Sequence, residues 1–80
     1  MQPKRFKKLD VRGAIAQGIE PFPAIREHAQ KLKPDEGLVV IAPFLPSPLI
    51  ERLAGEGFQW RFERGAQNTW VVYFWRESAG

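Results

Sequence analysis

The sequence contains no cysteine and a single histidine, His28. The absence of cysteine excludes disulfides, thiolate metal ligands and sulfur nucleophiles. One histidine excludes a histidine-rich metal site within one chain, so we predict neither a metal nor a cofactor. The longest apolar runs, residues 38–42 and 70–75, are far too short to span a membrane. Because no apolar segment follows the basic N-terminus, we expect no secretory signal and a cytoplasmic location.

Hydrophobic side chains are abundant for so short a chain. They make up 44% of the 80 residues and include three Trp, six Phe and one Tyr. This fraction is too high for a disordered chain, and the length leaves room for only one core. We therefore predict one folded domain over residues 1–80.

The net charge of +3 is unevenly distributed. The first twelve residues contain five basic side chains and one acidic side chain, whereas the remainder is nearly neutral. A nucleic-acid binder more often spreads lysine and arginine over a whole face. The pattern therefore disfavours nucleic acid and indicates a solvated first strand, with a phosphate-binding arm as the alternative.

Four segments have the patterns of β-strands. Residues 6–12 and 58–63 alternate between apolar and polar side chains, which is typical of strands with one wet face. Residues 38–42 are apolar at every position, which indicates a strand buried on both faces. Residues 69–75 form the last predicted strand, with apolar side chains on both faces. A glycine-containing connection between the last two strands predicts a hairpin.

Two segments have helical patterns. Prolines open the first helix, which we expect to run to residue 32 after a loop over residues 13–20. Ser47 is predicted to cap the second helix, and Gly55 to end it. The apolar stripe of the first helix has helical spacing and consists of Phe22, Ile25, Ala29 and Leu32.

The element order is therefore β-α-β-α-β-β. Strand–helix–strand units form parallel pairs with right-handed crossovers, which places both helices on the same face of the sheet. The predicted fold is a two-layer α/β sandwich with two helices on a four-stranded mixed sheet.

Several short motifs together resemble one known family. They are Leu9-Asp10-Val11-Arg12-Gly13, Pro21-x-Pro23, Gly57-Phe58-x-Trp60 and Trp70. An N-terminal motif followed by two prolines resembles the TusA/SirA-like sulfur carriers, and a later pair of motifs resembles their cysteine-less branch, a bacterial domain of unknown function. The similarity covers residues 8–76, and it implies a βαβαββ sandwich with strand order 1-2-4-3.

The resemblance also shows that the functional cysteine of the sulfur carriers is absent from this chain. Glu20 aligns with the cysteine that carries persulfide in the sulfur carriers, and a carboxylate cannot form a persulfide. Residues 42–46 also lack the polar segment found in cysteine-less relatives. We therefore expect that the chain is not an enzyme, and sulfur transfer is excluded for this chain alone.

Two surfaces remain as candidate binding sites. At the ends of the first two strands, helix starts could bind a small ligand or an anion. A pocket there is predicted to be lined by Arg12, Glu20, Phe44 and Ser47. The alternatives are that Glu20 only stabilises a helix start and that Arg12 only pairs with Asp10.

The second surface is the sheet face that the helices leave open. We expect it to carry apolar side chains of the two central strands, namely Val71, Tyr73 and Trp75 beside Val39 and Ile41 or the alternate residues of that strand. Exposed aromatic patches of this kind are typical of interfaces. The favoured interpretation is a non-catalytic interaction module that forms a homodimer or docks on a partner domain. A merely half-exposed face and the stacking of nucleic acid are the alternatives.

Overall fold

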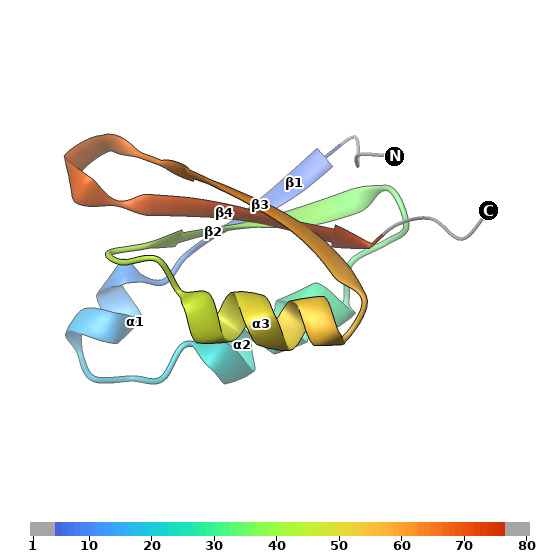
Figure 1. Cartoon of the computed structure of the whole chain (residues 1–80). Helices are drawn as coiled ribbons and strands as arrows, with labels where there is room; N and C mark the ends of the chain where they lie inside the picture. The colour runs from blue at the N-terminus through green and yellow to red at the C-terminus, as the bar shows by residue number, and fades with distance from the viewer. Residues whose placement is uncertain (1–4, 77–80) are drawn as a thin grey trace.

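The computed structural model describes residues 5–76, which form four strands, three α-helices and one short 3-10 turn (Figure 1). In chain order the elements are β1 (Arg5–Asp10), α1 (Arg12–Ala16), α2 (Phe22–Gln30), β2 (Glu36–Ala42), α3 (Ser47–Gly55), β3 (Phe58–Arg64), η1 (Ala66–Asn68) and β4 (Trp70–Arg76). No helix within this part of the chain is long and apolar enough to cross a membrane.

The strands form one mixed sheet in the order β1-β2-β4-β3. β1 and β2 are parallel, while β4 is antiparallel to both β2 and β3. Figure 1 shows that the helices all lie on one face of the sheet, and that no described element covers the other face. The predicted sandwich and its strand order are confirmed.

The core lies between the sheet and the helices. From the central strands, Leu38, Val40, Val72 and Phe74 all have no exposed surface. They pack in one cluster with Ile25 and Ala29 of α2 and with Leu53 of α3. The predicted stripe of α2 is therefore the face that packs on the sheet, with Phe22 half-buried at its edge.

Some local predictions were wrong. Arg12, expected to end the first strand, and residues 13–16, expected to lie in a loop, form α1. The N–H of Ile15 donates a hydrogen bond to the carbonyl oxygen of Val11 at 3.0 Å. Five residues are too few to show a helical pattern in the sequence. Ser47 makes no capping bond through its side chain; it is the first residue of α3, after Pro46 at the capping position. α2 ends at Gln30, earlier than expected.

The aromatic face of β3 is only partly covered. Phe58 is buried, but Trp60 and Phe62 are 43% and 40% exposed, although all three point to the helix side of the sheet. The nine residues of α3 span only about 14 Å, whereas the seven residues of β3 span about 24 Å. The helix therefore covers the start of β3 and leaves its far end exposed.

Candidate functional site

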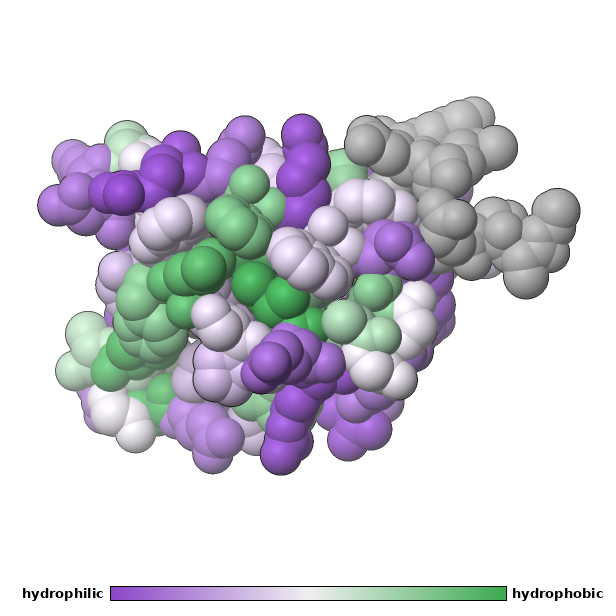
Figure 2. Space-filling model, viewed as in Figure 1, coloured by the Kyte–Doolittle hydropathy of each residue, from purple (hydrophilic) through white to green (hydrophobic). Residues whose placement is uncertain are grey.

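A pocket of about 310 Å³ lies between the helices and the helix-facing side of β2. Val11 and Ile15 line it near α1, Phe22 and Ile25 line it from α2, and Val40 forms part of its floor. Figure 2 shows hydrophobic surface gathered between the sheet and the helices where β2 leads into α3, the region that contains the pocket residue Phe44. Apolar side chains thus dominate the pocket.

The structure brings together two of the four predicted pocket residues. Glu20 and Phe44 line the pocket, and Phe44 is 51% exposed at its edge. Arg12 and Ser47 are not among the lining residues, although both are close in sequence to residues that are. A pocket thus lies beside the ends of β1 and β2, with two of the four residues in its lining, and ligand binding by these residues stays a prediction.

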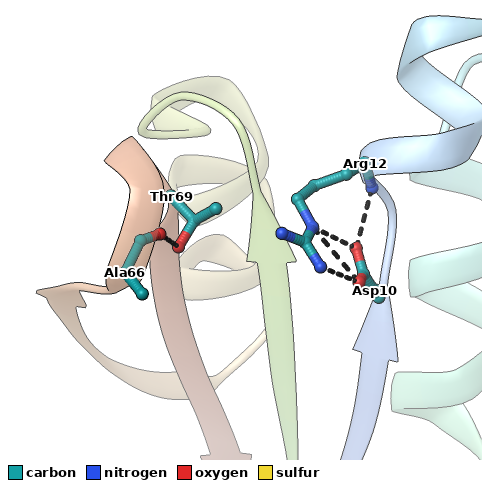
Figure 3. A network of polar contacts seen from close by, with 4 residues as sticks. All are labelled: Asp10, Arg12, Ala66 and Thr69. Atoms are coloured by element: carbon teal, nitrogen blue, oxygen red, sulfur yellow. Dashed lines mark hydrogen bonds and ion pairs between the residues drawn. The ribbon is translucent and has the colours of Figure 1, made fainter.

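Arg12 is absent from the pocket because it is held by Asp10 (Figure 3). The carboxylate of Asp10 accepts hydrogen bonds from Nε of Arg12 at 2.9 Å and from Nη2 at 2.6 Å. It also accepts one from the backbone N–H of Arg12 at 3.0 Å. These hydrogen bonds, with the positive charge of Arg12, lower the pKa of Asp10 to about 2. Of the two alternatives for Arg12, the geometry favours an ion pair that joins β1 to α1.

Arg52 is a pocket residue that the sequence did not reveal. It lies on the outer side of α3, and its guanidinium carbon is 4.9 Å from the centre of the Phe22 ring, a cation–π contact. Phe22 belongs to α2, so the contact joins two helices across the pocket. Only the packing of α2 against α3 makes this arginine part of the site.

The open face of the sheet has an ordered arrangement of side chains. The register aligns two rows across all four strands on this face. One row carries a cation at each end and the other an anion at each end. The first row is Lys8, Val39, Tyr73 and Arg61, and the second is Asp10, Ile41, Val71 and Glu63.

Contacts at the centre of the open face partly bury its aromatic side chains. The ring of Phe6 packs edge-on against Tyr73 at 5.2 Å and against Trp75 at 6.4 Å between centroids. The hydroxyl of Tyr73 donates a hydrogen bond to Glu63 at 2.7 Å, which raises the pKa of Tyr73. Arg61 lies 4.7 Å above the same ring. The five predicted residues share this face as expected, and each is half-buried rather than fully exposed.

Aromatic rings on the helix side form a second exposed apolar surface. Trp60 and Phe62 stack with nearly parallel rings at 5.7 Å, and Phe62 meets Trp70 edge-on at the same distance. Arg64 lies over the Trp70 ring at 5.0 Å. The sequence predicted a half-buried strand with one wet face here, and the exposure of its aromatic side chains was missed. The short helix preceding β3 is the signal that could have revealed it.

Among residues 5–76, no group of three or more histidine, aspartate or glutamate side chains could hold a metal ion. His28 is exposed on α2, and its Nδ1 is 2.8 Å from the carbonyl oxygen of Ala24.

Comparison with protein families gives one match. The model of the family described as "Uncharacterized conserved protein (DUF2249)" matches residues 8–76, which is most of the chain. The protein therefore belongs to this family. No curated protein and no solved structure gives a significant match to the chain. The expected membership of a domain family of unknown function is confirmed, while the wider relation to the TusA/SirA-like carriers stays a prediction.

Proposed function

We propose that this domain is a non-catalytic interaction module that forms a homodimer through the open face of its sheet. The proposal is carried by the two rows on that face, with apolar side chains at the centre and charges at both ends. An apolar centre with a polar rim is the usual anatomy of a protein interface. The non-catalytic part rests on the sequence, which has no cysteine to act in sulfur transfer.

The charges at the row ends favour a second copy of the chain as the partner. Consider a two-fold axis that runs perpendicular to the strands, parallel to the two rows and midway between them. This axis places the row with cations at its ends, in one copy, against the row with anions at its ends in the other copy. Lys8 then faces Asp10 of the second copy, and Arg61 faces its Glu63. The apolar centres meet in the same way, with Val39 against Ile41 and Tyr73 against Val71.

The other face-to-face arrangement is disfavoured by the same charges. A two-fold axis along the strands would lay each row on itself and bring Lys8 against Arg61 of the second copy. Asp10 would likewise face Glu63, and like charges brought together oppose association. The row pattern thus selects one orientation, in which the strands of the two sheets run nearly antiparallel.

A matched pair of arginine substitutions tests the proposal. Val71→Arg places a charge at the centre of the open face, whereas Phe62→Arg places one on the neighbouring strand but on the helix side. Analytical ultracentrifugation should find a dimer for the wild type and for Phe62→Arg, and a folded monomer for Val71→Arg.

Two results would count against the proposal. One is a wild-type protein that stays monomeric at high micromolar concentration, and the other is a Val71→Arg variant that dimerises like the wild type. Circular dichroism establishes that each variant is folded. If Val71→Arg does not fold, Arg61→Glu at the exposed end of the same face tests the same surface.

A further inference from the structure

We infer that the pocket between the helices and β2 binds a small zwitterion with an apolar body, the chemical class of the apolar amino acids. The pocket lies on the helix side of the sheet, so this inference does not depend on self-association through the open face. Its volume of about 310 Å³ is at the lower end of the range of small-molecule sites. That volume suits one branched or aromatic side chain.

The lining of the pocket consists mainly of apolar side chains, together with two charged ones. Ile15, Phe22 and Phe44 supply the accessible apolar wall, and behind them Val11, Ile25 and Val40 form a buried base. Against this wall the pocket has only two charged lining residues, Glu20 and Arg52. Burial of an apolar ligand group against such a wall is favourable because it removes hydrocarbon surface from water.

Both charged residues line the pocket beside the start of α2. The guanidinium of Arg52 packs on the ring of Phe22, and Phe22 follows Glu20 by two residues at the start of α2. Among the described residues, no hydrogen bond or ion pair joins Glu20 to Arg52. Both residues are exposed, and neither charge neutralises the other in the free pocket.

Opposite charges in one pocket select among ligands. A simple carboxylate would be attracted by Arg52 but repelled by Glu20. A simple amine, which is protonated, would be attracted by Glu20 but repelled by Arg52. A molecule that carries an ammonium and a carboxylate group next to an apolar side chain satisfies both residues at once. Charge complementarity of this kind gives specificity more than affinity.

Titration of the ¹⁵N-labelled full chain with four related compounds, followed by NMR, tests the inference. L-phenylalanine carries both charges, 3-phenylpropionate only the carboxylate, phenethylamine only the ammonium, and benzyl alcohol neither. L-phenylalanine should shift the amide signals of residues 11–22 and 40–52 in a saturable manner. It should bind roughly fivefold more tightly than 3-phenylpropionate and phenethylamine, as expected for one added charge pair at a partly exposed site. It should exceed benzyl alcohol by a larger factor, because benzyl alcohol lacks both pairs.

Two exposed substitutions identify the charged contacts. Arg52→Gln should reduce the affinity for L-phenylalanine to that for phenethylamine, and Glu20→Gln should reduce it to that for 3-phenylpropionate. Arg26→Gln, on the exposed side of α2, serves as the control and should bind like the wild type. The inference is overturned if no compound shifts these signals, if all four bind equally, or if Arg52→Gln leaves the preference intact.

Discussion

The carboxylate of Asp10 binds both the guanidinium and the backbone N–H of Arg12, with the closest atoms 2.6 Å apart. This ion pair fixes the turn from β1 into α1 and holds the arginine away from the pocket that the sequence assigned to it. The same carboxylate ends one of the two charged rows on the open face. One acidic residue thus serves the local fold and also belongs to the proposed interface.

The ion pair predicts how Asp10 titrates. Arg12 lowers the pKa of Asp10 from 3.8 to about 2. Because the folded-state pKa is below the unfolded value, the pair stabilises the fold above pH ~4. The stabilisation is then lost as the pH falls toward 2. NMR should place the titration midpoint of the Asp10 carboxyl near 2 in the wild type. In Arg12→Gln the midpoint should rise but stay below 3.8, because the backbone N–H of residue 12 keeps its hydrogen bond. A wild-type midpoint near 3.8 would contradict the geometry of the pair.

The core predicts a sharp difference between two substitutions to alanine. Leu38 has no exposed surface, so Leu38→Ala should lower the free energy of unfolding by about 2–5 kcal/mol. Ile19 is 56% exposed, so Ile19→Ala should change it by less than about 0.5 kcal/mol. Urea denaturation followed by circular dichroism measures both values. Similar losses for the two variants would mean that the sheet and helices pack differently.

The charges at the ends of the two rows predict that reversing one charge weakens the dimer and that reversing its partner as well restores it. Arg61→Glu would bring two acidic groups together twice in the symmetric dimer and should weaken it about tenfold. Adding Glu63→Arg restores opposite charges, so the double variant should return to within about threefold of the wild type. Sedimentation velocity gives the dissociation constants. Arg64→Glu, on the helix side of the same strand, is the control and should dimerise normally.

Failure of the double variant to recover would count against the proposed orientation of the two copies. Failure of Arg61→Glu to weaken the dimer would mean that this end of the row does not reach the second copy.

The fold could be predicted from the sequence because each strand has a clear pattern. Side chains alternate between the faces of a strand, so Val72 and Phe74 had to share one face and Val71 and Tyr73 the other. With the strand order, this placed Val39 and Ile41 beside them correctly. α1 could not be predicted because a helix of five residues has too few positions to show a period.

The pocket could be predicted only in part because it combines segments that are distant in sequence. Glu20 and Phe44 follow from their places beside the ends of β1 and β2. Arg52 joins them through the packing of two helices, and no local pattern records that contact. Arg12 was misplaced because an ion pair with a residue two positions away determines its side-chain direction.

The exposure of Trp60 and Phe62 depends on the relative lengths of two elements. Their alternation correctly assigned them to the helix side of β3, but alternation does not say whether a helix reaches them. The length of α3 decides that, and it leaves both rings at the surface.

Sedimentation equilibrium of the unmodified protein, over low to high micromolar concentrations, tests the central claim most directly. Association through the open face predicts a reversible monomer–dimer equilibrium, with the fraction of dimer increasing with concentration. A single species with the mass of one chain at every concentration would contradict the claim.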